Sequence, residues 1–445
     1  MTIKNAIVKA AVVACTVALV GTAGCAGRAD NQDGHAAMSN GSSDVTGGNG
    51  TNDATGITDE NSINSATGIA EVELNDIYTQ PESVVEHSLV ATGHTGRMKR
   101  MLEKAARGED ITVAFIGGSI TYGYKVKKEE CFATLYTNWL SEKFGTSVRC
   151  VNAGISGTPS VLGNLRVEDE VLAEKPDLVV VEFAVNDGGE TVYKNSYESM
   201  VSRILKADNE PAVMLLFTIT ENGHTCEEWM KTVGEHYSLP MVSVVSSMME
   251  ECKAGRISFK DYSGDGVHPN TQGHRWINEY LKYATWQIWE AESGQEEYVY
   301  PEKAAIARFY ENMVLHTDDD AQIEDYGSWD KASPDSMKDF TDTFAHGWTY
   351  IPGKENEPLV IKANCRCILL IYKDVPGGDK NYGAIDVMVD GKVKKGVVAQ
   401  SAGGWYEPTF SVIMEEVTAK EHEISIKMQD GFEDKQFEIM GIAWL

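Results

Sequence analysis

A serine, an asparagine and an aspartate–histidine pair stand far apart in this sequence, each beside an apolar run. Ser119 follows two glycines in AFIGGSITYG, Asn186 ends the run VEFAVN, and Asp265 and His268 lie three residues apart in SGDGVHPN. A serine hydroxyl becomes an effective nucleophile when a histidine takes its proton and a carboxylate fixes the histidine tautomer. Ser119, His268 and Asp265 therefore have the residue types of a nucleophilic triad.

Donors for a developing oxyanion are available in the same stretches. The tetrahedral intermediate of acyl transfer needs hydrogen-bond donors that are in place before the reaction. The backbone N–H groups of Ser119 and Gly157 and the side-chain amide of Asn186 would provide three. Each stretch taken alone is an ordinary turn or loop signal. Their order, with each at a predicted strand end or loop, predicts a single active site.

An alternation of apolar strands and amphipathic helices would bring these residues together. Such a pattern predicts an α/β fold with a doubly wound parallel sheet covered on both faces, whose sites lie at the carboxyl ends of the strands. Glu182 falls inside the third strand, where we expect a buried, paired carboxylate rather than a catalytic one. The predicted strands lie at 111–118, 147–154, 176–187, 211–220 and 239–246, and clear helical stretches at 129–145 and 196–208.

Over about residues 95–290 this arrangement resembles the SGNH or GDSL hydrolase family, named for its Ser, Gly, Asn and His. Two positions depart from the family pattern: Gly118 stands where the name-giving motif has Asp, and Ala184 stands where the G-x-N-D block has Gly. Neither change removes a reacting group. The resemblance implies that Ser119 is the nucleophile and an oxyanion donor, that Gly157 and Asn186 are the other oxyanion donors, and that Asp265 and His268 complete the triad.

The N-terminal residues have the form of an export signal. Residues 1–25 contain two lysines, an apolar run from Ala10 to Val20 and the ending TAGC. This ending resembles a bacterial lipobox, although Thr22 stands where leucine is usual, and it implies lipidation of Cys25. We expect a protein anchored by lipid to the cell envelope, with plain secretion as the alternative. Residues 26–70 are rich in Gly, Ser, Asn, Asp and Thr, which predicts a disordered tether.

The formal charge of −28 restricts the partners. A polyanion would be repelled at long range, so nucleic acid and an anionic membrane surface are poor candidates. We expect a neutral substrate, and contact with a membrane only through the lipid anchor. An acidic surface that merely keeps a secreted protein soluble would explain the same charge equally well.

The chain beyond the first folded unit is richer in short strands. We expect a linker at 291–338 and an antiparallel β-sandwich at 339–445. Residues 71–94 are a connecting segment, which could add an edge strand to the sandwich. Aromatic residues of the sandwich could stack on sugar faces or could equally belong to its core or to a domain interface. These aromatics are Trp348, Tyr350, Tyr382, Trp405 and Tyr406.

Six cysteines follow Cys25, and their spacing does not predict a metal site. Cys365 and Cys367 alternate on an apparent strand and are expected on one buried face. If an exported chain forms a disulfide, Cys226 and Cys252 are the first candidates. No cofactor is expected.

A β-sandwich beside an SGNH unit resembles the two-domain carbohydrate esterases that remove acetyl groups from polysaccharides. The resemblance implies a serine esterase that acts on acetylated polysaccharide through an acyl-enzyme. Two alternatives remain open: a lipase, lysophospholipase or thioesterase, and a non-catalytic surface lipoprotein that binds glycans. The non-catalytic alternative is disfavoured because the chain retains a potential nucleophile, base and oxyanion donor that a binding protein does not need. These residues are Ser119, Asn186, Asp265 and His268.

Overall fold

The computed structural model describes residues 72–292, 296–332 and 342–445. All of them lie in one compact unit, Glu60–Leu445. The predicted signal peptide, Cys25 and the predicted tether lie outside the described residues. Within the described ranges, no helix has the length and apolar character needed to cross a bilayer.

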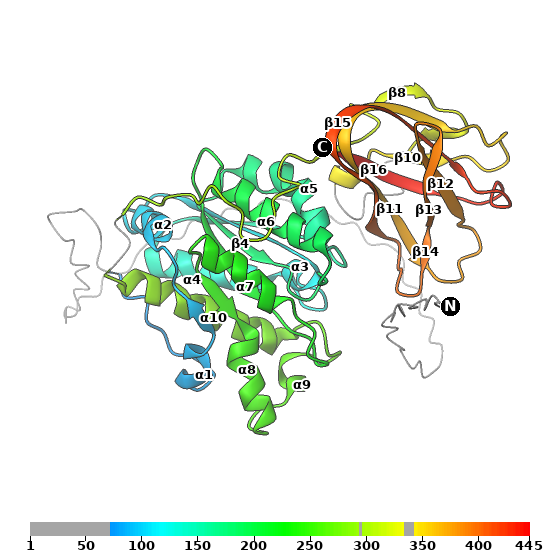
Figure 1. Cartoon of the computed structure of the whole chain (residues 1–445). Helices are drawn as coiled ribbons and strands as arrows, with labels where there is room; N and C mark the ends of the chain where they lie inside the picture. The colour runs from blue at the N-terminus through cyan, green and yellow to red at the C-terminus, as the bar shows by residue number, and fades with distance from the viewer. Residues whose placement is uncertain (1–71, 293–295, 333–341) are drawn as a thin grey trace, which may run out of the picture. The chain divides into compact units, whose positions relative to one another are not determined.

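The first folded part is a six-stranded sheet with helices on both faces (Figure 1). The strand order is β1-β6-β5-β4-β2-β3, and every pairing is parallel except that of β1 with β6. The predicted doubly wound α/β fold is confirmed. The strands are β1 (Leu89–Ala91), β2 (Ile111–Gly117), β3 (Val148–Gly154), β4 (Leu178–Glu182), β5 (Ala212–Phe217) and β6 (Met241–Ser243).

Neighbouring residues of the central strands pack into different cores. Val113 and Phe115 lie in one apolar cluster with α2, α4, α8 and α10, whereas Ala114 and Ile116 lie in another with α5, α6 and α7. Burial on both faces explains why the strands read as unbroken apolar runs. The helices are α1 (Glu82–Glu86), α2 (Gly96–Ala106), α3 (Ser119–Tyr122), α4 (Phe132–Phe144), α5 (Ser160–Glu170), α6 (Thr191–Leu205), α7 (Glu227–His236), α8 (Val244–Lys253), α9 (Phe259–Tyr262) and α10 (Thr271–Glu290).

The connecting segment before the first long helix does add an edge strand, but to a different sheet from the one expected. Leu89 pairs with Val242 of β6, so β1 extends the six-stranded sheet and not the sandwich. Leu74 and Val85 are buried in the core of that same unit. The expectation of an edge strand on the sandwich is therefore wrong, because burial of these apolar residues ties the segment to the nearer sheet.

The C-terminal part is the predicted antiparallel β-sandwich (Figure 1). Its ten strands form one hydrogen-bonded network, because β11 and β15 are long and bend at register shifts, as between Cys365 and Cys367. The short strand β14 pairs in parallel with β11, whereas the other pairings are antiparallel. The strands are β7 (Val314–His316), β8 (Gln322–Asp325), β9 (Trp329–Lys331), β10 (Trp348–Tyr350), β11 (Leu359–Pro376), β12 (Ala384–Val389), β13 (Lys392–Val398), β14 (Gln400–Ser401), β15 (Glu407–Met428) and β16 (Glu438–Trp444).

Three of these strands lie in the stretch that the sequence assigned to a linker, 291–338. β7 pairs with β16, β8 with β11 and β9 with β10. The sandwich therefore begins before residue 339. Trp329 is buried in its core, but the polar residues around these short strands hide the strand pattern.

The two domains share an apolar cluster. Leu162 and Leu165 of α5 pack with Leu369 and Ile371 of β11, and Tyr310 joins them from the chain between the domains. Burial of this apolar surface stabilises the contact between α5 and β11.

The cysteines differ from expectation in two respects. All six in the described part of the chain are free, so the suggested Cys226–Cys252 disulfide is absent; the Cys226 thiol instead donates to the backbone oxygen of Asp187 at 3.1 Å. Cys365 and Cys367 are buried, but they lie in different apolar clusters because the register of β11 shifts between them.

Candidate active site

Ser119 lies where β2 ends, at the first position of the short helix α3. The two preceding glycines are needed for close packing: a Cβ atom on Gly117 would lie 2.1 Å from Thr121 Oγ1, and one on Gly118 would lie 2.2 Å from Asn186 Oδ1. Thus Gly118, one of the departures from the family pattern, leaves room for the Asn186 side chain beside the serine.

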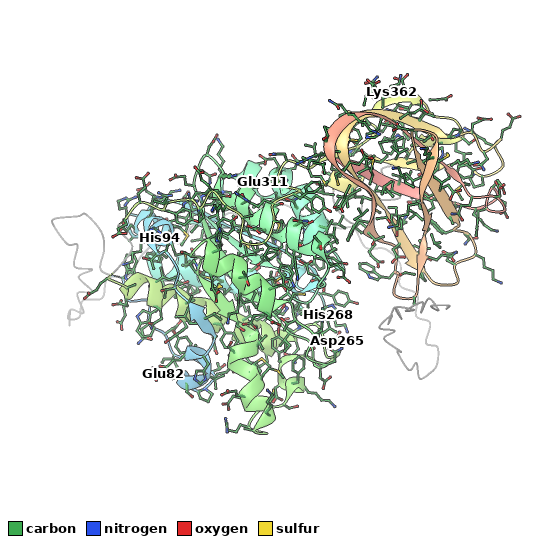
Figure 2. All side chains as sticks on the ribbon, in the orientation of Figure 1. Glu82, His94, Asp265, His268, Glu311 and Lys362 are labelled. Carbon is green, nitrogen blue, oxygen red and sulfur yellow. The ribbon has the colours of Figure 1, made fainter. Side chains whose placement is uncertain are left out.

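Ser119, His268 and Asp265 form a continuous chain of hydrogen bonds. His268 Nε2 lies 3.0 Å from Ser119 Oγ, and His268 Nδ1 lies 2.8 Å from Asp265 Oδ2. Figure 2 shows His268 and Asp265 next to each other at the edge of the α/β domain. The backbone N–H groups of Val267 and His268 donate to Asp265 Oδ1 at 3.0 and 2.8 Å, which fixes the carboxylate. This geometry is that of a nucleophile, a base and the group that orients the base.

A lysine and a tyrosine border this triad. Lys125 Nζ lies 2.5 Å from Asp265 Oδ2, and the Tyr124 ring meets the His268 ring edge-on with 4.7 Å between centroids. Partial burial favours the protonated form of Asp265, but hydrogen bonds from Lys125 and His268 outweigh it and hold the pKa well below its usual range. Asp265 is therefore ionised at neutral pH.

The structure also brings Gly157 and Asn186 to the same place. They line, with Ser119 and His268, one hollow of about 590 Å³. Gly157 has φ of +76°, a conformation that glycine adopts without strain. Every residue that the sequence predicted for the triad and the oxyanion donors thus lies at one site.

Three exposed aromatic residues complete the walls of this hollow. Tyr122 and Tyr124 come from the chain just after Ser119, and Trp405 comes from the sandwich, 3.0 Å from the Cβ position of Gly157. Sequence reasoning missed Tyr122 and Tyr124, although both lie within five residues of the predicted nucleophile.

The five aromatics that the sequence proposed as a sugar platform divide into two groups. Trp348, Tyr350 and Tyr382 are buried and belong to the sandwich core, so these three do not form a sugar-binding platform. Trp405 and Tyr406 are exposed, and the Tyr406 hydroxyl donates to Asp379 Oδ2 at 3.1 Å. Among the five, only these two expose a large part of the side chain.

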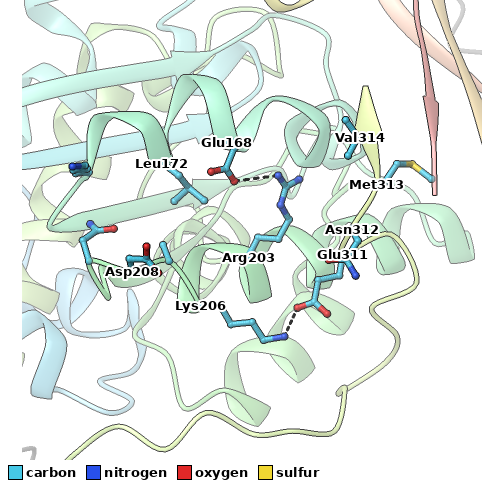
Figure 3. Close-up of a pocket in the computed structure, with 12 residues that line it drawn as sticks. Glu168, Leu172, Arg203, Lys206, Asp208, Glu311, Asn312, Met313 and Val314 are labelled. Atoms are coloured by element: carbon cyan, nitrogen blue, oxygen red, sulfur yellow. Dashed lines mark hydrogen bonds and ion pairs between the residues drawn. The ribbon is translucent and has the colours of Figure 1, made fainter. Parts of the chain in front are cut away.

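A larger hollow, of about 990 Å³, lies elsewhere, beside α5 and α6 (Figure 3). Two of the cations in its wall are paired with carboxylates of the same wall: Arg203 with Glu168 at 3.3 Å, and Lys206 with Glu311 at 2.6 Å. Its lining residues include no serine, cysteine or histidine. We therefore place the chemistry at the smaller hollow that contains Ser119.

Residues 115–276 match the model of the GDSL-like Lipase/Acylhydrolase family, a range that contains Ser119, Gly157, Asn186, Asp265 and His268. This part of the chain is a GDSL-like hydrolase domain. The GDSL-like domain is 25% identical over 178 residues to thioesterase 1/protease 1/lysophospholipase L1 of Escherichia coli strain K12. This match covers 38% of this chain and 81% of that protein. The same domain is 24% identical over 179 residues to an arylesterase of Vibrio mimicus, and this match covers 37% of this chain and 84% of the arylesterase.

One similarity extends over both domains. A solved two-domain esterase (CEX) active on acetylated mannans, crystallised with mannopentaose, is 26% identical to this chain with a TM-score of 0.72. The match covers 81% of this chain and 97% of that one. The two-domain architecture of this chain is thus similar to that of CEX, and the family match lies in the first of the two domains.

Proposed function

We propose that this protein removes acetyl groups from an acetylated polysaccharide through an acetyl-enzyme on Ser119. The hydrogen-bonded chain from Ser119 through His268 to Asp265 is the observation that carries the proposal. Ser119 Oγ attacks the ester carbonyl while its proton passes to His268 Nε2, and the ionised Asp265 stabilises the imidazolium that forms.

The oxyanion then meets donors that are already in place. Ser119, Gly157 and Asn186 all line the hollow in which the carbonyl oxygen would develop charge, and in this proposal the two N–H groups and the Asn186 amide donate to it. His268 returns its proton to the departing sugar oxygen, which breaks the ester bond and leaves the acetyl group on Ser119. A water molecule, activated by His268, releases acetate and restores the serine.

The walls of the site favour a sugar ester as the substrate. An aromatic ring stacks well on the apolar face of a pyranose, and Tyr122, Tyr124 and Trp405 are all partly exposed around the nucleophile. Because Trp405 comes from the sandwich, a polymer could contact both domains while its acetyl group lies at Ser119. The similarity to CEX over both domains supports acetylated mannan as the first substrate to test.

Acetate release from acetylated mannan, xylan, pectin and peptidoglycan tests the substrate class. We expect release from a plant polysaccharide by the wild type, no release by Ser119→Ala, and full activity of Ser246→Ala, an exposed serine of α8 away from the site. A nitrophenyl ester series of increasing chain length separates the alternatives. A rate that rises with chain length would favour a lipase or thioesterase, and binding of glycan without any hydrolysis would favour a non-catalytic lectin-like role.

The sequence also supports a proposal about location. We propose that the mature protein begins at Cys25, carries lipid there and is held at the cell envelope; the small residues before Cys25 and the apolar run before them support this. Mass spectrometry of membrane-extracted protein should find a lipidated N-terminal cysteine. A mature chain that starts at another residue and is recovered from the medium would contradict the anchor.

A further inference from the structure

Glu182 is a fully buried carboxyl group next to the turn that carries the nucleophile. It is the last residue of β4 and pairs in register with Gly117, the last residue of β2. Its side chain has no exposed surface. A carboxyl group in such a place is costly unless hydrogen bonds satisfy it.

Two threonine hydroxyls donate to Glu182, and one of them belongs to the turn around Ser119. Oε2 accepts from the Thr121 hydroxyl at 2.9 Å. The other donor, the Thr218 hydroxyl just after β5, lies 2.6 Å from Oε1. Burial raises the pKa of Glu182, and these hydrogen bonds, with the nearby backbone N–H groups of Thr121 and Gly118, oppose that rise.

These contacts hold the chain on both sides of the nucleophile. Before Ser119, Gly117 pairs in register with Glu182 across β2 and β4. After Ser119, the Thr121 hydroxyl is bound to the Glu182 carboxylate. Ser119 lies between these two held residues and lines the hollow.

We propose that Glu182 is a positioning residue, which holds the Gly118–Thr121 turn so that the Ser119 hydroxyl and N–H point at the substrate carbonyl. It does not touch the substrate and transfers no proton in this account. The inference rests on the proposed function, since it takes Ser119 as the nucleophile.

Loss of the acceptor would act on the rate of chemistry rather than on substrate binding. Without Glu182, the buried Thr121 hydroxyl would lose its acceptor, and the turn would shift to find another partner. Both the attacking oxygen and one oxyanion donor would then be misplaced. Removal of one oxyanion donor costs about 100-fold or more in kcat in a comparable site, and misplacement of the donor should cost part of that factor.

Glu182→Met and Glu182→Gln are a matched pair for the test, because both keep the length of the side chain and only glutamine keeps an acceptor. Active sites are counted by titration with a fluorophosphonate, and kcat per titrated site and KM are measured on nitrophenyl acetate. We expect a fall of about 30-fold or more in kcat per site for Glu182→Met, KM within about twofold, and recovery to within about fivefold in Glu182→Gln. A merely structural role would reduce the number of titratable sites or the melting temperature and leave the rate of each remaining site unchanged.

Thr218→Val and Thr121→Val provide a second comparison if Glu182→Met does not fold. Each removes one hydroxyl donor from the same carboxylate, but only Thr121 belongs to the nucleophile turn. We expect a several-fold loss of kcat per site in Thr121→Val and a change within about twofold in Thr218→Val. Equal effects of the two, or a rate per site in Glu182→Met within about threefold of wild type, would overturn the inference. If the wild type itself is not labelled by the fluorophosphonate, the proposed serine mechanism fails instead.

Discussion

Replacement of Trp405 tests whether the sandwich contributes to the site. Trp405 is 46% exposed and lines the hollow that contains Ser119. A tryptophan side chain presents about 250 Å², so on the order of 110 Å² is open to a ligand. If one sugar ring covers roughly half of that area, burial at ~25 cal/mol per Å² contributes about 1.4 kcal/mol, close to tenfold.

Trp405→Ala should therefore lower kcat/KM on an acetylated oligomannoside by about tenfold. Nitrophenyl acetate lacks a sugar to stack, so its hydrolysis should change by less than about threefold. Trp405→Phe, which keeps a smaller ring, should fall between. Val417→Ala removes an apolar group that is 90% exposed on the same domain and is the control.

Both substrates should be assayed on variants with unchanged melting temperature, because Trp405 also lies against Gly157. Equal losses on the two substrates would mean that Trp405 acts by supporting the Gly157 turn. No loss on either would refute the reasoning that a sugar ring lies on this face.

Three further predictions concern charge and metal. Burial raises the pKa of Asp187 to about 8, although hydrogen bonds from Ser160 lower it in part. The folded state therefore keeps a proton on Asp187 at pH values where the unfolded chain has released it. The unfolding free energy of the wild type, relative to Asp187→Asn, should thus fall as pH rises from about 4 to about 8; a pH-independent difference in denaturant melts would contradict this. Lys125→Met removes the cation that helps to depress the pKa of Asp265, so acid unfolding should begin at a higher pH than in the wild type, and an unchanged midpoint would refute the role of this pair. EDTA should leave ester hydrolysis unchanged, and a loss of activity restored by zinc would reveal a metal site.

The parts of the site that depend on local sequence could be predicted. Glycines before Ser119, the turn at Asn186 and the three-residue spacing of Asp265 and His268 all mark strand ends or loops, and parallel strands place such ends at one edge. The alternation of strands and helices therefore predicted the sheet, and the order of the motifs predicted the triad.

The parts of the fold and of the site that depend on tertiary contacts could not be predicted from the sequence. The pairing of β1 with β6 and the position of Trp405 beside Gly157 join residues distant in the sequence. The role of Glu182 depends on donors from two other strand ends, which its own neighbours in the sequence do not reveal. The strands β7, β8 and β9 are too short for an alternating pattern to stand out.

Trapping of the acyl group on Ser119 tests the central claim most directly. The wild type is mixed with an isotopically labelled acetyl ester, quenched in acid within the first turnover, digested and mapped by mass spectrometry. The account predicts one labelled acetyl group on the peptide that contains Ser119, and none in Ser119→Ala. Rapid acetate release with no acetyl group on that serine, or with the label on another residue, would contradict it.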